Sequence, residues 1–263
     1  MFRPVDYQKH FVIGTPLVGW KCDRKEHLAW LEHADKVIEK FPNAKFFAAF
    51  ELDDRGLEPF KDVIERLKQL NGDYWTYQIN DNESKVTYGN RWIRIETGRN
   101  LIREFAQRLR RLSGHHWGED TWKDNVGVIN YDAILYVDSD MYVGPTIIEK
   151  LFEVDHPIVS VDVPAYGLRG KLINENPRIE EHWNTAGMLL VNAPAYYDLP
   201  WSHNAYRNLS DDPTFQQHAQ RLKQFGSEET YGMTWVRKDI KAQHMGQLVA
   251  VESRNIPDRK LSN

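Results

Sequence analysis

Apolar residues along this chain fall into two alternating patterns, short runs and longer stretches with helical spacing. Short apolar runs predict strands at residues 11–18, 44–50 and 73–79. Between them, apolar side chains recur every three or four positions over residues 28–41 and 60–70, which predicts helices. Strands that alternate with helices in this way favour an α/β fold built on a doubly wound sheet.

The pattern continues after residue 100 but becomes less regular in the second half. The unbroken apolar run at residues 133–137 is typical of a parallel strand that is buried on both faces. Residues 114–126 and 166–183 are polar and too long for ordinary connections, so we expect each to be a lid, a binding loop or a disordered segment. The other predicted elements are helices at residues 102–112 and 147–152 and strands at residues 158–163 and 188–191.

The size and charge of the chain limit the kinds of protein it can be. With 263 residues, of which 41% are hydrophobic, we expect one domain over residues 1–263. The net charge of −4 supplies no global positive field that would attract nucleic acid or an anionic membrane. Any phosphate group must therefore be bound by local groups.

Cysteine content and hydropathy bear on the cellular compartment. The single cysteine, Cys22, excludes an intrachain disulfide framework and a cysteine-based zinc cage, and it indicates a reducing compartment. The first ten residues lack the apolar run of a secretory signal. No apolar stretch approaches the roughly 20 residues of a membrane-spanning helix. We therefore expect a cytoplasmic protein.

Two aspartates follow the most apolar of the predicted strands. Asp138 and Asp140 come directly after residues 133–137, and open α/β sheets bind ligands beyond the carboxyl ends of their strands. Two ionised carboxylates at close range repel each other, so a hard divalent ion such as Mn²⁺ or Mg²⁺ is the natural compensation. A D-x-D tripeptide is common in solvated turns, but the buried strand before this one favours a metal site.

The surroundings of these aspartates resemble the D-x-D strand of GT-A glycosyltransferases, particularly those similar to family 2. The resembling segment is Tyr-Asp-Ala-Ile-Leu-Tyr-Val-Asp-Ser-Asp-Met at residues 131–141. Upstream, Gly98-Arg99-Asn100 resembles the A-R-N helix start of that family. Downstream, residues 187–191 resemble its Gly-x-Met-Leu strand, residues 199–201 its Leu-Pro-x-Pro-Trp-like segment, residues 227–229 its S/T-E-D motif and residues 244–246 its H-x-G motif. The motifs occur in the family's order, and their joint occurrence by chance is far rarer than that of any single one.

The resemblance implies a GT-A fold with a mostly parallel central sheet and a glycosyltransferase activity. Residues 1–130 would form a nucleotide-binding half and residues 131–263 a metal and acceptor half. The implied donor is a nucleotide-diphosphate sugar of the UDP or GDP type, and the acceptor is an unknown glycan, protein, lipid or small molecule. The implied ligands of Mn²⁺ or Mg²⁺ are Asp138, Asp140 and His244. The implied donor-binding residues are Thr15 and Pro16 after the first strand, Glu51 after the second, Arg99, Asn100, Asp138 and Ser139.

The Ser-Glu-Glu segment at residues 227–229 is the candidate for catalysis. It is predicted to open a helix with Ser227 at the N-cap and with Trp235 and Val236 among its apolar positions. Glu229 aligns with the family's catalytic Asp, so the resemblance implies an inverting transfer with Glu229 as base and Glu228 beside it. Both glutamates also suit a structural role, because the positive end of a helix favours nearby anions.

Three alternatives stay open at this point. The segment Asn184-Thr185-Ala186 before Gly187 also resembles the N-x-G strand of retaining glycogenin-like enzymes, which likewise combine D-x-D with a late His, and Glu229 in place of Asp leaves the stereochemistry open. Haloacid-dehalogenase-like phosphohydrolases place D-x-D after a buried strand too, although their motif lies near the N-terminus and continues with Thr or Val where this chain has Tyr142. The third alternative is a binding protein that kept the fold without activity, and the presence of both aspartates and both glutamates argues against it.

Overall fold

The computed structural model describes residues 3–23, 25–79, 89–112, 131–154, 158–162, 187–192, 201 and 234–241. The strands within these residues are β1 His10–Val18, β2 Ala44–Glu51, β3 Asp73–Tyr77, β4 Tyr131–Val137, β5 Ile158–Asp162, β6 Met188–Val191 and β7 Thr234–Lys241. The α-helices are α1 Ala34–Lys40, α2 Lys61–Gln69, α4 Gly89–Leu112 and α5 Pro145–Phe152, and the 3₁₀ helices are η1 Gly19–Asp23, η2 Lys25–Leu31 and η3 Glu58–Phe60. All the predicted strands are present, with small shifts at their ends.

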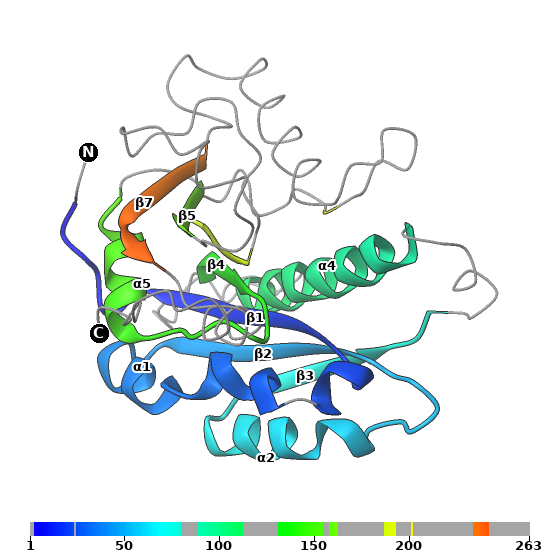
Figure 1. The fold of residues 1–263 in the computed structure, drawn as a ribbon. Coiled ribbons are helices and arrows are strands. Elements are labelled where there is room, and N and C mark those ends of the chain that lie inside the picture. The colour runs from blue at the N-terminus through cyan, green and yellow to red at the C-terminus, as the bar shows by residue number, and fades with distance from the viewer. Residues whose placement is uncertain are drawn as a thin grey trace, which may run out of the picture.

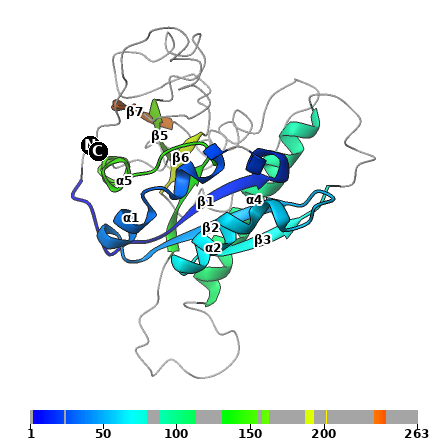
Figure 2. The ribbon, with the colours of Figure 1, turned by 60° about the horizontal axis from the view of Figure 1, so that its bottom comes forward.

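The strands form one sheet of seven strands in the order β3-β2-β1-β4-β6-β5-β7. The pairs β1–β2, β2–β3, β1–β4 and β5–β7 are parallel. β6 runs antiparallel to both of its neighbours, β4 and β5. The sheet is therefore mixed but mostly parallel, as the sequence predicts, and Figure 2 shows β3 and β7 at its opposite ends.

Different helices cover the two faces of the sheet, because successive residues of a strand point to opposite faces. Phe11 and Ile13 of β1 pack in a buried cluster that includes residues of η2, α1, α2 and α5. Val12, between them, packs on the other face in a cluster that includes Ile102 and Phe105 of α4. Figure 1 shows α4 on one side of β1 and β2, with α1 and α2 on the other side.

Two glycines let α4 lie close against β1. A Cβ atom at Gly14 of β1 would lie 2.2 Å from Cγ2 of Ile102 on α4. A Cβ atom at Gly98 of α4 would lie 2.6 Å from Cβ of Pro16 on β1. Packed side chains do not approach one another so closely, so helix and strand meet at this distance because both positions lack a Cβ. Arg99 and Asn100, which follow Gly98, are thereby held near the end of β1.

The helix predicted at residues 28–41 is divided in the structure. η2 ends at Leu31 and α1 begins at Ala34. Trp30 of η2 and Val37 of α1 are nevertheless buried in the same cluster. The apolar spacing therefore predicted the burial correctly, and it did not detect the break in the helix.

The helix predicted to follow Ser227 does not extend over Trp235 and Val236, which belong to strand β7. β7 runs parallel to β5, with Trp235 opposite Val159. Pairing with this buried strand explains the difference, because Trp and Val fit strands at least as well as helices.

The helix start predicted at Gly98 is also wrong, because α4 begins at Gly89 and Gly98 lies inside it. α4 is 24 residues long. Neither α4 nor any other helix in the described ranges is long and apolar enough to cross a membrane.

The contact between Gly14 and Ile102 predicts a coupling between these two positions. We expect Gly14→Ala to lower the free energy of unfolding by about 1 to 3 kcal/mol, because the new methyl group overfills a closed contact. In an Ile102→Ala background, which removes the two nearest atoms, Cγ2 and Cγ1, and leaves Cβ at 3.2 Å, the same change should cost much less. Urea unfolding of the four proteins measures both values. Equal losses in both backgrounds would contradict the packing described here, and Gly144→Ala, whose Cβ would lie 3.9 Å from the nearest atom, serves as a control.

Candidate functional site

β4 ends where the order of the strands reverses along the chain. From β1 the chain continues to β2 and β3 on one side, and it then returns to β4 on the other side of β1. β1 pairs with β4 only from His10 to Gly14, although it stays paired with β2 as far as Val18. Ligands of open α/β sheets bind beyond the carboxyl ends of the strands at such a reversal. The residues that follow β4 are therefore the first candidates for a binding site.

Asp138, Ser139 and Asp140 form the turn after β4. The backbone N–H of Asp138 donates to the carbonyl oxygen of Gly187 over 2.8 Å, and that of Met141 donates to the carbonyl oxygen of Asp138 over 3.0 Å. The side chain of Ser139 is buried, whereas Asp138 and Asp140 are partly exposed. Both aspartates predicted to bind metal are thus partly exposed, although Oδ1 of Asp140 is buried, and they lie on a turn that backbone hydrogen bonds hold.

Arg99 of α4 places its guanidinium beside the first of these aspartates. Its Nη2 lies 3.5 Å from Oδ1 of Asp138, and its side chain is 4% exposed. Its Cζ lies 4.6 Å from the centre of the Trp201 ring, within the range of a cation–π contact. The structure therefore brings together two residues that the sequence assigned to the donor site, and it adds Trp201 as a neighbour.

Asn100, the next residue of α4, holds the backbone of Trp201. Its Nδ2 donates to the carbonyl oxygen of Trp201, and its Oδ1 accepts from the N–H of Trp201, both over 2.9 Å. The indole of Trp201 packs edge-on against Tyr136 of β4, with ring centres 4.9 Å apart. Burial raises the pKa of Tyr136 to about 12, although Trp201 and the cations Arg103 and Arg99 oppose the shift. Tyr136 therefore stays neutral at physiological pH.

A second polar group lies at the end of β2. The buried carboxylate of Glu51 forms an ion pair with Arg94 on α4, with its Oε1 3.2 Å from Nε. The hydroxyl of Tyr77 on β3 donates to the backbone carbonyl of Arg94 over 2.9 Å. Burial, and then the charge of Glu51, raise the pKa of Tyr77. The sequence identified Glu51 but missed Arg94, because the helix was predicted to begin only at Gly98.

Thr15 and Pro16 lie inside β1, which extends to Val18 as the strand prediction for residues 11–18 has it, so their assignment to the segment after the strand is wrong. Thr15 is fully buried, and its Oγ1 has no hydrogen-bond partner among the described residues. Pro16 lies where the pairing of β1 with β4 has ended, which suits a residue without a backbone N–H. Contact of these two residues with a donor stays a prediction.

The acidic residues after β2 form a surface network. Arg55 bonds Asp53 through Nη2 over 2.7 Å and Asp23 of η1 through Nη1 over 2.8 Å. The hydrogen bond from Arg55 holds the pKa of Asp53 below its usual value. Arg55 thus links the segment after β1 to the segment after β2. Its bond to Asp53 gives this aspartate a structural role.

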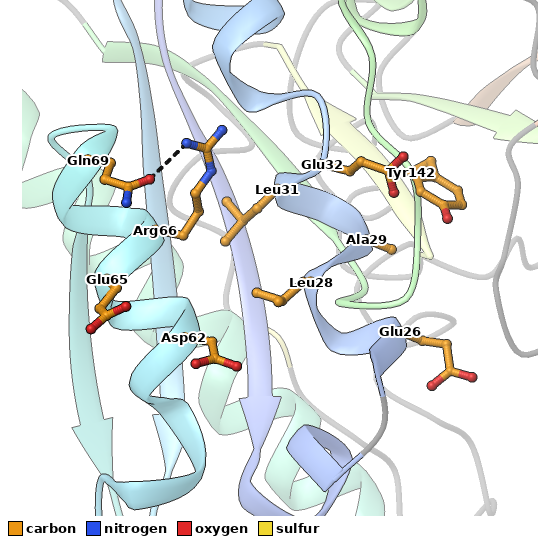
Figure 3. A pocket seen from close by; sticks show the side chains of 10 residues that line it. All are labelled: Glu26, Leu28, Ala29, Leu31, Glu32, Asp62, Glu65, Arg66, Gln69 and Tyr142. Carbon is orange, nitrogen blue, oxygen red and sulfur yellow. Dashed lines mark hydrogen bonds between the residues drawn. The ribbon is translucent and has the colours of Figure 1, made fainter.

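The structure also contains a cleft of about 440 Å³ between η2 and α2, shown in Figure 3. Its apolar lining comes from Leu28, Ala29 and Leu31, and Tyr142 lies next to Glu32 at its edge. The charged lining consists of Arg66 and four carboxylates, those of Glu26, Glu32, Asp62 and Glu65. Like charges repel, so this acidic cleft does not suit a diphosphate. It lies on α2, on the face of the sheet opposite α4.

The remaining predicted site residues lie outside the described part of the chain. These are Glu228, Glu229 and His244. Among the described residues, no group of three or more His, Cys, Asp or Glu side chains is arranged to hold a metal ion. The donor set available there consists of the carboxylates of Asp138 and Asp140, and carboxylate oxygens fit Mn²⁺ or Mg²⁺.

Comparison with known proteins identifies the fold. No protein-family model matches the chain, and no curated protein matches it in sequence. Among solved structures, S. aureus TarS is similar over 95% of this chain and 40% of its own, at 11% identity and a TM-score of 0.51. The mannosyltransferase PcManGT from Pyrobaculum calidifontis, solved with GDP-Man and Mn²⁺, has 11% identity over 99% of this chain and 69% of its own, with a TM-score of 0.48. The galactosyltransferase LgtC, solved with donor and acceptor sugar analogs, has 14% identity over 86% of this chain and 73% of its own, with a TM-score of 0.38.

The likeness to TarS, together with the mixed sheet and its strand order, shows that this chain has the GT-A fold. The fold prediction is therefore confirmed. The chain spans two fifths of the TarS chain, since the match covers 40% of it.

The pair formed by Glu51 and Arg94 predicts an asymmetric loss of stability. Arg94→Met removes the guanidinium from the Glu51 carboxylate, whose side chain is only 8% exposed. We therefore expect the free energy of unfolding to fall by about 1 to 3 kcal/mol. Glu51→Gln in the same variant removes the buried charge and should recover part of this loss. Arg66→Met, whose partner Asp35 is 74% exposed, is the matched control and should cost less than about 1 kcal/mol. Equal losses in the two arginine variants, measured by urea unfolding, would refute a stabilising role for the pair.

Proposed function

We propose that this protein is a metal-dependent glycosyltransferase that moves a sugar from a nucleotide-diphosphate sugar to an acceptor. The observation that carries the proposal is the ion pair of Arg99 on α4 with Asp138, which lies with Asp140 in the turn after β4, at the reversal of strand order in a GT-A sheet. Two partly exposed aspartates, one of them beside a cation, suit a ligand that combines a divalent ion with an anionic diphosphate. The motif similarity to family 2 is part of the same proposal.

In this proposal each donor-binding residue has a separate task. Asp138 and Asp140 bind Mn²⁺ or Mg²⁺, and His244 completes the ligand set. Arg99 lies beside Asp138 and offers a planar guanidinium to the diphosphate, a geometry that suits phosphate oxygens. Glu51, at the end of β2, is assigned to the nucleoside with Thr15 and Pro16. Asn100, which bonds the backbone of Trp201, and Ser139, which is buried between the two aspartates, belong to the donor site as well.

The transfer itself needs a leaving group that accepts charge and an acceptor that loses a proton. The metal ion, when bound, stabilises the negative charge that develops on the departing diphosphate. The acceptor hydroxyl attacks the anomeric carbon while the bond from that carbon to the diphosphate oxygen breaks. Glu229 takes the proton of the hydroxyl, with Glu228 beside it, and the configuration at the anomeric carbon inverts.

Retention remains the second candidate mechanism, because Glu229 replaces the usual Asp. The phosphohydrolase alternative has less support, because the antiparallel strand β6 lies between β4 and β5 in a sheet of the GT-A kind. The configuration of the product, read by NMR, distinguishes inversion from retention.

The first test of this proposal is nucleotide binding. Calorimetry with UDP and GDP is expected to detect binding in the presence of Mn²⁺ and little binding after chelation. Asp140→Asn should weaken the binding of Mn²⁺ with its nucleotide about tenfold or more, because it removes a charged ligand, and His244→Ala should weaken it too. Trp75→Leu, on the distant edge strand β3, is the control. Unchanged nucleotide affinity after chelation, or in Asp140→Asn, removes the metal from the account.

The second test concerns the base. Glu229→Gln keeps the shape of the side chain and removes its basicity, so we expect transfer to slow about a hundredfold or more while donor affinity changes little. Steady-state kinetics and donor calorimetry of the same variant measure the two quantities. Transfer at the wild-type rate, or a product that retains the donor's anomeric configuration, would rule out Glu229 as an inverting base.

A further inference from the structure

A side-chain clamp joins α4 to Trp201, a residue far along the chain. Asn100 bonds both the N–H and the carbonyl of Trp201, each over 2.9 Å. The side-chain amide of Asn100 thus pairs with the N–H and the carbonyl of one residue at once, as the backbone of a neighbouring strand would. The position and the orientation of Trp201 relative to α4 are therefore both fixed.

The clamp determines what the indole of Trp201 faces. The ring has an edge-on contact with Tyr136 on one side and the guanidinium of Arg99 over its face, 4.6 Å from its centre. Trp201 is 1% exposed and Arg99 is 3% exposed, so neither side chain has room to turn freely. Cation–π contacts are strongest when both groups are removed from water, as they are here.

Arg99 connects this packing to the candidate metal site. Its Nη2 lies 3.5 Å from Oδ1 of Asp138, on the side chain that packs against Trp201. The series Asn100, Trp201, Arg99 and Asp138 is thus continuous, and each contact in it is observed.

We propose that Asn100 and Trp201 are positioning residues that aim Arg99 at Asp138 and thereby set the balance between metal binding and nucleotide binding. This inference rests on the proposed function, because it assumes that Asp138 binds a divalent ion and that Arg99 contacts the diphosphate. Arg99 neutralises part of the charge that Asp138 offers to the ion, so it weakens binding of the ion alone. The same guanidinium, held in place, strengthens binding of the anionic nucleotide that arrives with the ion.

Arg99 thus weakens binding of the ion alone and strengthens binding of the nucleotide. Because these two effects have opposite signs, a positioning role of Asn100 and Trp201 can be distinguished from a purely structural role. If the clamp is removed, Arg99 is free to move away from Asp138. Mn²⁺ alone then binds as tightly as before or more tightly, whereas UDP and GDP in the presence of Mn²⁺ bind about tenfold more weakly. A general loosening of the site would instead weaken both.

The experiment compares the 263-residue chain with its Asn100→Ala variant in two titrations. The first uses Mn²⁺ alone, followed by calorimetry. The second uses UDP or GDP with Mn²⁺ present in excess. Weaker nucleotide binding with unchanged or tighter Mn²⁺ binding supports the proposal. Any other pattern in a folded variant, including equal weakening of both ligands or no change in either, overturns it.

A second variant and a matched control keep the test independent of folding. Trp201→Phe keeps the backbone groups that Asn100 holds and a smaller ring against Arg99, so the same opposite changes should appear with smaller size. Trp75→Leu removes another tryptophan that faces an arginine of α4, with Cζ of Arg108 5.9 Å from the ring centre, and should leave both affinities unchanged. Circular dichroism confirms that each variant is folded. A wild-type chain that binds neither Mn²⁺ nor nucleotide refutes the proposed function itself, an outcome distinct from a folded Asn100→Ala that binds like wild type.

Discussion

The close contact between α4 and β1 is the constraint on which the candidate site depends. It requires Gly14 on the strand and Gly98 on the helix, because a Cβ at either position would overlap Ile102 or Pro16. Three residues of α4 take their places from this contact. Arg94 reaches Glu51 at the end of β2, Arg99 reaches Asp138 after β4, and Asn100 reaches Trp201. One helix thus contributes a side chain to each of these three contacts.

Local charge, and not global charge, determines which ligand suits which surface. The chain carries a net charge of −4, so binding of a diphosphate requires cations placed at the site itself. In the proposed site Arg99 is such a cation, and Asp138 and Asp140 are the ligands proposed for a divalent ion. The acidic cleft on α2 has the opposite character, with four carboxylates around an apolar floor. The chemistry of a nucleotide donor therefore favours the turn after β4 over the cleft.

The sequence predicted the parts of this arrangement that depend on local pattern. The apolar run before Asp138 gave the position of β4 and of the turn, and the motif at residues 98–100 pointed to Arg99 and Asn100, whose contacts are with Asp138 and Trp201. Arg94 was missed because no cap or apolar spacing in the sequence indicates that α4 begins as early as Gly89. The contact between Asn100 and Trp201 was missed because it joins residues 101 positions apart, and no periodicity reports such a distance. β7 was taken for part of a helix because its strand character depends on β5, which local spacing does not contain.

The most direct test of the central claim is to locate the metal ion. Crystals of the protein grown with Mn²⁺ and UDP or GDP, measured for anomalous scattering from manganese, give the position of the ion without reference to any assumed mechanism. The account predicts one strong peak within about 2 to 2.5 Å of a carboxylate oxygen of Asp140, with the diphosphate on the side of Arg99. A peak in the acidic cleft near Glu32 or Asp62, with none beside Asp138 and Asp140, would contradict it.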